Sequence, residues 1–124
     1  MLTNSQVTAI LPAVNLDRAR KFYEQKLGLK IQEANATDIL YECGQGTMLY
    51  LYQRGQTKAD HTAAGFSVDN IEAQMNDLRS RGVVFEEYDF PGLKTENGVA
   101  MMGHVKSAWF RDTEGNILAL TQRF

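Results

Sequence analysis

Hydrophobic and polar positions alternate with two different periods along the chain. Residues 7–14 form a short, mostly apolar run that is typical of a buried strand. Apolar residues then recur at the spacing of a helix, at Leu16, Ala19, Tyr23 and Leu27. Between residues 29 and 53 the pattern changes to short strand-like runs. The first half of the chain is therefore predicted to form one strand, one helix and three further strands.

Local signals set the bounds of these elements. Asn15 is placed to cap the helix, and Gly28 supplies the left-handed conformation that ends it. The last two strands are joined by the glycine-bearing turn Gly44-Gln45-Gly46. The three strands are expected at residues 29–33, 38–43 and 47–53.

The same order of elements recurs in the second half as an internal repeat. Residues 14–33 align with 68–87 at an offset of 54, and residues 46–54 align with 115–123 at an offset of 69. The change of offset places 15 extra residues between about Tyr88 and Lys106. The second helix has a capping-box-like start at residues 69–72, apolar positions at Ile71, Met75 and Leu78, and Gly82 after its end. Strands are expected at 62–68, 83–88, 107–112 and 117–122.

Length and charge narrow the possible classes of protein. The 124 residues suit one domain over residues 1–124, with module one at about 7–54 and module two at about 61–123. A formal charge of −2, without a run of basic residues, makes nucleic acid an unsuitable partner. The densest acidic run, residues 86–89, is expected to be a solvated strand end.

Cysteine content and the N-terminus indicate a cytoplasmic protein. The single cysteine, Cys43, has no partner for an intrachain disulfide or a zinc motif, and it is expected to be a buried small hydrophobe rather than a nucleophile. The first six residues lack the cationic start of a signal peptide. The apolar run at 7–14 is far shorter than a membrane span, so no membrane partner is expected.

Several motifs in the two halves together point to a known family. They are Asn15-Leu16, Ala19, Phe22-Tyr23 and Leu27-Gly28-Leu29 in the first half, and 66–69, Leu78, Gly82-Val83, 109–112 and 115–120 in the second. On these residues the sequence resembles the vicinal oxygen chelate superfamily, which contains glyoxalases, extradiol dioxygenases, fosfomycin-resistance enzymes and bleomycin-binding proteins. Essentially the whole chain is covered. The motifs are specific for the fold but poor guides to function, because one scaffold hosts several chemistries.

The resemblance implies an α+β fold in which two βαβββ modules form an open, barrel-like sheet around a cavity, with the helices outside. Alternation along the last strand of each module then sorts the side chains. The residues expected to pack under the helices are Leu49, Leu51, Leu118 and Leu120. Those expected on the cavity side are Met48, Tyr50, Tyr52, Ile117, Ala119 and Thr121.

Metal-dependent members of the superfamily hold a divalent ion with His or Glu side chains on the first and last strands of each module. Carried over to this chain, those positions fall on Thr8, Tyr50, Ala63 (or Thr62 if the register slips by one) and Ala119. Because none of these is a usual metal ligand, we expect no metal and no other cofactor. A site that joins His61 and His104 with Glu96 or Glu42 is conceivable, although no spacing requires it.

The expected ligand-binding residues are Met48, Tyr50, Tyr52, His61, Trp109 and Arg111. Trp109 and the tyrosines offer flat apolar surface, and Arg111 shares the strand face of Trp109. Such a shelf beside a cation suits a planar acid or a conjugated antibiotic. The alternative is a structural role, in which these rings only fill the interior of the barrel.

Two functions are consistent with these features. The first is a metal-independent protein that sequesters a small aromatic or amphipathic ligand. The second is a lyase, isomerase or dioxygenase-type enzyme of the same superfamily, whose catalytic residues the sequence leaves unknown. In either case the long insertion is expected to be a lid or an interface element, and the apolar segment 99–102 requires cover, which predicts a homodimer.

Overall fold

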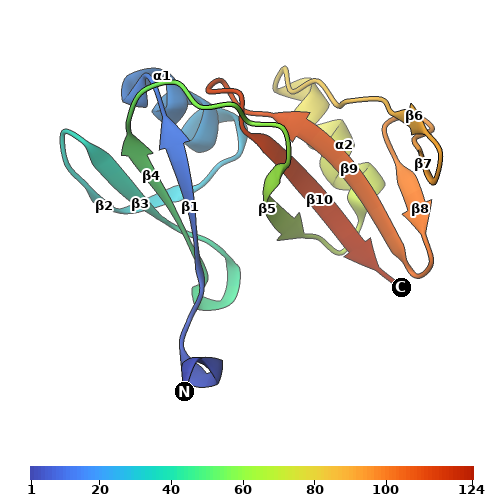
Figure 1. Ribbon diagram of the computed structural model, residues 1–124, viewed down its shortest axis with the longest axis horizontal. Coiled ribbons are helices and arrows are strands. Elements are labelled where there is room, and N and C mark those ends of the chain that lie inside the picture. Colours follow the sequence, from blue (N-terminus) through green and yellow to red (C-terminus); the bar gives the residue numbers. More distant parts are fainter. The chain divides into compact units, whose positions relative to one another are not determined.

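The computed structural model describes all 124 residues, which form two compact units, Met1–Lys58 and Ala59–Phe124. Each unit contains one four-stranded sheet with a helix along one face (Figure 1). The expected α+β class is confirmed. The expectation of a barrel-like sheet is corrected in one respect: the two four-stranded sheets are separate, and neither closes into a barrel.

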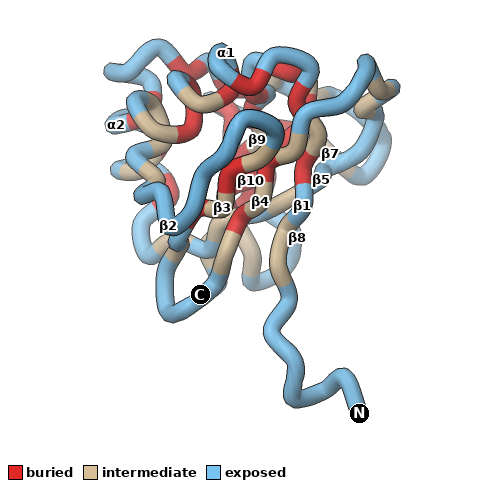
Figure 2. Tube along the Cα trace, turned by 90° about the vertical axis from the view of Figure 1, so that its left-hand side faces the viewer, coloured by how far each residue is buried: buried red, intermediate tan, exposed pale blue.

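The first unit has the sheet order β1-β4-β3-β2, in which β1 is parallel to β4 and the other pairs are antiparallel. Its core lies between the helix and the facing side of the sheet, where Leu11, Ile39 and Leu51 are buried. Strand β2 is exposed along its whole length (Figure 2). The elements are η1 (Leu2–Asn4), β1 (Thr8–Ala13), α1 (Leu16–Lys21), η2 (Phe22–Lys26), β2 (Lys30–Ala34), β3 (Asp38–Glu42), η3 (Gly44–Gly46) and β4 (Met48–Gln53).

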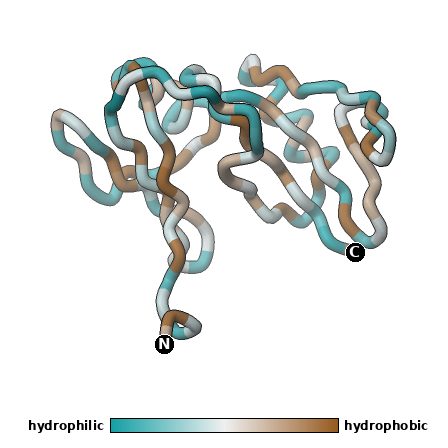
Figure 3. Tube along the Cα trace, viewed as in Figure 1, coloured by the Kyte–Doolittle hydropathy of each residue, from teal (hydrophilic) through white to brown (hydrophobic).

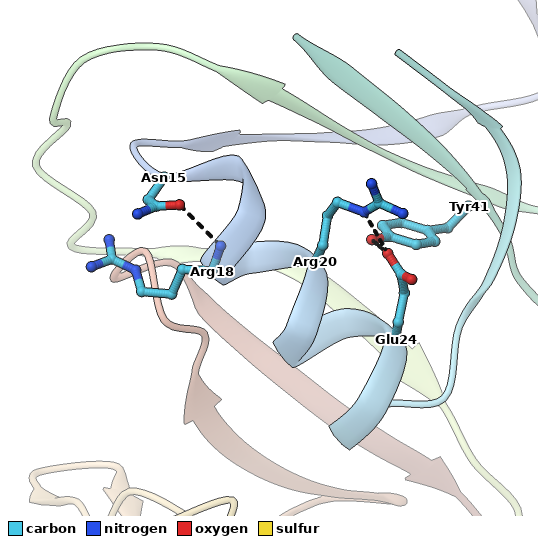
Figure 4. Close-up of polar contacts among 5 residues, drawn as sticks. All are labelled: Asn15, Arg18, Arg20, Glu24 and Tyr41. Carbon is cyan, nitrogen blue, oxygen red and sulfur yellow. Dashed lines mark hydrogen bonds and ion pairs between the residues drawn. The ribbon is translucent and has the colours of Figure 1, made fainter. Parts of the chain in front are cut away.

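The first helix begins as expected but changes its winding. The side-chain oxygen of Asn15 accepts a hydrogen bond from the Arg18 backbone at 3.0 Å (Figure 4). After α1 the chain continues as the π-helical turn η2, in which the consecutive large residues Phe22 and Tyr23 are both buried. The Tyr23 ring stacks on Tyr41 of β3 with centroids 6.0 Å apart, and the Phe22 ring meets Tyr23 edge-on at 5.5 Å. Gly28, at a φ of 73°, follows the helix.

A polar contact fastens this turn to the sheet (Figure 4). The phenol of Tyr41, on β3, donates a hydrogen bond to Glu24 Oε2 at 2.9 Å, and Arg20 Nε donates to the same oxygen at 3.0 Å. Burial, together with the Glu24 carboxylate, raises the pKa of Tyr41. The Tyr41 hydroxyl therefore stays protonated and holds the π-helical turn in place.

The second unit has the sheet order β5-β10-β9-β8, with β5 parallel to β10. Asn70 caps α2 by accepting from the Ala73 backbone at 3.0 Å. Gln122 Oε1 also accepts from the first helical amide, Ile71, which ties the helix to β10. Figure 3 shows the hydrophobic stretch of β10 giving way to hydrophilic residues near the C-terminus. The elements are β5 (Thr62–Ser67), α2 (Ile71–Ser80), β6 (Asp89–Phe90), β7 (Leu93–Lys94), β8 (Ala100–Met102), β9 (Val105–Arg111) and β10 (Ile117–Arg123).

The strand expected at 83–88 is wrong. Only Phe85 bridges to β9, opposite Phe110, and the Glu86 amide donates to the Trp109 carbonyl at 2.8 Å. Further along β9, β8 takes over the same edge. One edge of the sheet is thus occupied first by residues 85–86 and then by β8, while residues 87–99 leave the sheet; we call these residues the excursion. The insertion expected at residues 89–106 therefore divides in the structure: residues 89–99 lie in the excursion, which contains the hairpin β6–β7, and the rest includes β8 and the start of β9.

The helices are all too short or too polar to cross a membrane.

Candidate functional site

Each sheet has a face opposite its helix, and most of the candidate residues lie on these two faces, which we call the open faces. In the first unit, Tyr50 pairs with Ile10 on one side and with Leu40 on the other. The rings of Tyr50 and Tyr52 stack with centroids 6.5 Å apart and an interplanar angle of 16°. Met48 lies on the same face of β4, because these three side chains alternate with the buried Leu49 and Leu51.

Tyr50 is a neutral polar group on this face. Desolvation raises the pKa of its phenol, and the nearby carboxylates of Asp38 and Glu33 raise it further. The hydroxyl therefore remains protonated at neutral pH. This face offers two stacked rings and a hydrogen-bonding phenol.

The open face of the second unit carries a row of three aromatic rings. Trp109 pairs with Ala119 on β10, which in turn pairs with Gly65 on β5. Tyr88 meets Trp109 edge-on, with centroids 5.5 Å apart and an interplanar angle of 64°. Phe90 stacks on Tyr88 at 5.6 Å and 23°. We call Trp109, Tyr88 and Phe90 the aromatic ladder.

Tyr88 and Phe90 were missed as site residues by sequence reasoning. The signal was present, because Phe85 is an inward-facing apolar residue and alternation from it places Glu86 and Tyr88 on the other side. The acidic neighbours of Tyr88 led to the expectation of a solvated strand end. In the structure Tyr88 is half-buried, and burial raises the pKa of its phenol.

Arg111 lies on the same face as Trp109, but its charge is balanced. Its Nε donates to Glu86 Oε1 at 2.8 Å, and its Nη1 donates to the Gly115 carbonyl at 3.2 Å. About half of the Arg111 side chain and a third of the Glu86 side chain remain exposed. The cation expected beside the aromatic shelf is therefore one half of an ion pair.

The excursion is fastened to the unit at its base. Glu87 Oε1 accepts hydrogen bonds from Thr95 Oγ1 at 2.6 Å and from the Gly98 amide at 2.9 Å. These bonds lower the pKa of the Glu87 carboxyl. Gly98 has a φ of 82°, a backbone conformation that other residues rarely adopt, and a Cβ there would also lie 3.3 Å from Phe85 Cβ, so glycine is favoured at this position.

The two histidines lie in different settings. His61 precedes β5 with a side chain that is 77% exposed, and its Nδ1 lies 3.4 Å from Asp60 Oδ1. The ring of His104 meets Phe124 edge-on at 6.4 Å, and its carbonyl accepts from the Phe124 amide. His104 thus packs against the C-terminal residue. No three His, Cys, Asp or Glu side chains are grouped as a metal site would require.

The superfamily's metal positions do not carry suitable donors. Thr8 pairs with Met48 at the start of β1, and Ala119 lies between Gly65 and Trp109. A register shift after Thr62 leaves Ala63 without a pairing partner on β10. A threonine hydroxyl, two alanines and a tyrosine with a raised pKa do not form a ligand set for a divalent ion. The residues present therefore do not fit the metal that the superfamily's enzymes use.

Other reactive groups give no catalytic arrangement. Burial raises the pKa of the Cys43 thiol, which keeps the thiol in its unreactive protonated form. A shallow depression of about 400 Å³ lies beside α1, lined by Asp17, Arg20, Lys21, Glu24 and Gln25. It has charges of both signs and no aromatic surface, and its Arg20 and Glu24 are already paired.

Solved structures with this fold have different activities. The chain is similar to lactoylglutathione lyase from Agrobacterium tumefaciens, with 21% identity, a TM-score of 0.69 and coverage of 97% of this chain and 95% of that one. It is similar to TnmS3, an antibiotic-binding protein from Streptomyces sp. CB03234, with 17% identity, a TM-score of 0.68 and coverage of 98% of this chain and 99% of that one. It is also similar to the fosfomycin resistance protein FosX from Mesorhizobium loti, with 11% identity, a TM-score of 0.69 and coverage of 98% of this chain and 93% of that one.

At these identities the structural likeness establishes the fold alone. No curated protein matches the chain in sequence. The family assignment comes from a sequence model that matches residues 5–120, nearly the whole chain. The protein accordingly belongs to the glyoxalase/bleomycin resistance protein/dioxygenase superfamily.

Proposed function

We propose that this protein binds a planar aromatic or amphipathic small molecule and does so without a metal ion. The observation that carries the proposal is the aromatic ladder, in which three rings follow one another from the open face of a sheet to an exposed hairpin. A single ring of this kind is often only core filling. Phe90, however, is 57% exposed, so this row is not closed off as a core would be.

In the second unit the proposed contact residues are Trp109 and Arg111, with His61 as an exposed neighbour of β5. On the open face of the first unit, Met48, Tyr50 and Tyr52 form a separate set of proposed contacts. Stacking and apolar burial provide most of the affinity. Because Glu86 balances Arg111, we propose a ligand of low net charge rather than a strong acid. TnmS3, whose fold this chain shares, is an antibiotic-binding protein, which supports a small-molecule ligand for this chain.

A homodimer in the cytoplasm completes the proposal. The β8 edge strand has no strand on its outer side, and Met101 and Met102 on it are 58% and 42% exposed. A second copy would cover these side chains. The absence of cysteine pairs is consistent with a reducing compartment.

The function is tested with a fixed panel of probes: bleomycin, an anthracycline and anilinonaphthalene sulfonate. Trp109 is the single tryptophan, so its fluorescence reports binding near the ladder directly. We expect at least one probe to change this fluorescence saturably, with a dissociation constant in the micromolar range or below. If none of the probes binds, as checked by calorimetry, the proposed function is wrong.

A further inference from the structure

Phe90 covers a face of Tyr88 on which a planar ligand would stack. Resting on the proposed function, we propose that Tyr88 is the stacking platform for the ligand and that Phe90 is a gate residue, which must leave the Tyr88 ring before the ligand binds. The gate consists of the hairpin β6–β7, which holds Phe90 in the free protein.

The ring geometry supports this assignment. Phe90 and Tyr88 are nearly parallel, at 23°, which is the offset-stacked arrangement that a planar ligand would itself adopt on a tyrosine. Tyr88 meets Trp109 at 64°, so the contact between these two rings is edge-on and is not the arrangement that a stacked ligand would adopt. Phe90 therefore makes the contact that a ligand ring would need.

The fold does not require Phe90 to stay where it is. Its hairpin contains only two paired residues on each strand and turns through Pro91-Gly92, where a Cβ on Gly92 would meet nothing within 4 Å. More than half of the Phe90 surface is exposed. Moving this tip breaks few contacts apart from the stack on Tyr88.

The base of the excursion, by contrast, is held firmly. Glu87 binds Thr95 and Gly98, and Arg79 Nη2 donates to the Asn97 carbonyl at 3.0 Å. Arg79 also lies over the buried Phe85 ring, 5.2 Å from its centroid. The tip can therefore swing while the base keeps Tyr88 against Trp109.

If Phe90 is a gate residue, its substitution should change the affinity for the ligand in an unusual direction. Removing an apolar side chain from a binding site normally weakens binding. If Phe90 competes with the ligand, Phe90→Ala instead removes the competitor and strengthens apparent binding. One stacked ring pair favours the closed state by about two- to tenfold, so the gain in affinity is of that size.

The experiment compares three variants with the parent protein, using the three probes named above and calorimetry. Phe90→Ala is expected to bind at least one probe about two- to tenfold more tightly, and Tyr88→Leu to bind it at least about fivefold more weakly. Phe124→Ala is the matched control, because Phe124 is 58% exposed in the same unit but contacts His104 rather than the ladder. It should bind like the parent. Melting temperatures confirm that each variant is folded.

The sign of the Phe90→Ala effect decides the inference even if Tyr88→Leu fails to fold. Equal or weaker binding by Phe90→Ala, with a parent that binds, overturns the gate and leaves the proposed function standing. A probe that binds the parent weakly and Phe90→Ala more tightly supports the gate. If no probe binds either protein, both the proposed function and the gate are wrong.

Discussion

Arg111 Nε donates to Glu86 Oε1 at 2.8 Å, on the same face of the sheet as Trp109. Both residues come to this place by alternation, Arg111 two positions after Trp109 on β9 and Glu86 next to the bridging Phe85. The pair gives the ladder a polar neighbour with little net charge. A site built in this way selects ligands by shape more than by charge.

Removal of the Glu86 carboxylate should leave the Arg111 guanidinium without its ion-pair partner. In Glu86→Gln, Arg111 keeps its charge but loses its partner, so the anionic probe anilinonaphthalene sulfonate should bind up to about fivefold more tightly, as expected for a partly exposed ion pair. The anthracycline, whose amine is cationic at neutral pH, should not bind more tightly. The comparison is made by calorimetry at low salt, where exposed charges act most strongly.

Glu72→Gln is the matched control for that experiment. Glu72 accepts from Lys106 Nζ at 2.7 Å, and both residues lie on the helix side of the same unit. Equal tightening in both variants would show a general effect of net charge and not a role for Arg111.

Truncation of Trp109 tests the shelf itself. Trp109→Ala removes a stacking surface worth about 1 kcal/mol and about 2 kcal/mol or more of apolar burial, so probe binding should weaken at least tenfold. Trp109→Phe, which keeps a ring, should lose less. Calorimetry is used because the variants lack the fluorophore, and melting temperatures account for the space left in the sheet. Unchanged affinity in a folded Trp109→Ala protein would show that the Trp109 ring only fills space on the sheet and does not contribute to probe binding.

The stability that Glu87 contributes at the base of the excursion should depend on pH. Hydrogen bonds from Thr95 and Gly98 depress the pKa of Glu87 below the ordinary value of 4.5. The carboxylate therefore stabilises the folded protein above that value, and the contribution is lost as the pH falls through the lower folded pKa. Glu87→Gln should melt at a lower temperature than the parent at neutral pH, and the difference should vanish in acid.

Glu96→Gln provides the comparison for Glu87, since it lies in the same excursion and its backbone, not its carboxylate, pairs with Val99. Its melting temperature should follow that of the parent at every pH. A constant difference between Glu87→Gln and the parent from neutral to acid pH would contradict the anchor.

The repeat made most of the fold predictable, because strong signals mark its elements. Asn15 and Gly28 bound the first helix, and alternation around Leu49 and Leu51 assigns the faces of β4. The π-helical turn was not predictable, because its contacts to the sheet, the stacking of Tyr23 on Tyr41 and the hydrogen bond from Tyr41 to Glu24, join residues distant in sequence.

The site was predictable only in part. Trp109 and Arg111 share a face, as period-two alternation requires. The interruption of the edge strand after Glu86 has no local signal, because it depends on β9 accepting two separate segments along one edge. Alternation from Phe85 gives the face on which Glu86 and Tyr88 lie, but the contact of Tyr88 with Phe90 depends on the interruption and could not be foreseen from local signals.

The exposed edge of β8 leads to a prediction on oligomeric state. We expect light scattering at high micromolar concentration to give a dimer and not a single 14.0 kDa species. Met101→Lys should shift the equilibrium toward monomer, because it places a charge on the edge strand. Leu2→Lys, at another exposed apolar side chain, should leave the dimer intact. A parent protein that stays monomeric contradicts the prediction.

The most direct measurement is binding of the three probes by protein stripped of metal with a chelator. The titration with anilinonaphthalene sulfonate, which unlike the other two probes does not chelate metal ions, is repeated after addition of zinc, nickel, iron(II) or manganese. The positions that hold metal in the superfamily's enzymes are Thr8, Tyr50, Ala63 and Ala119 here, and the proposed ligand contacts need no ion. We therefore predict saturable binding by the metal-free protein with a dissociation constant that added metal leaves unchanged. Binding that appears only with one metal ion per chain, or a stoichiometric metal in the purified protein, would contradict it.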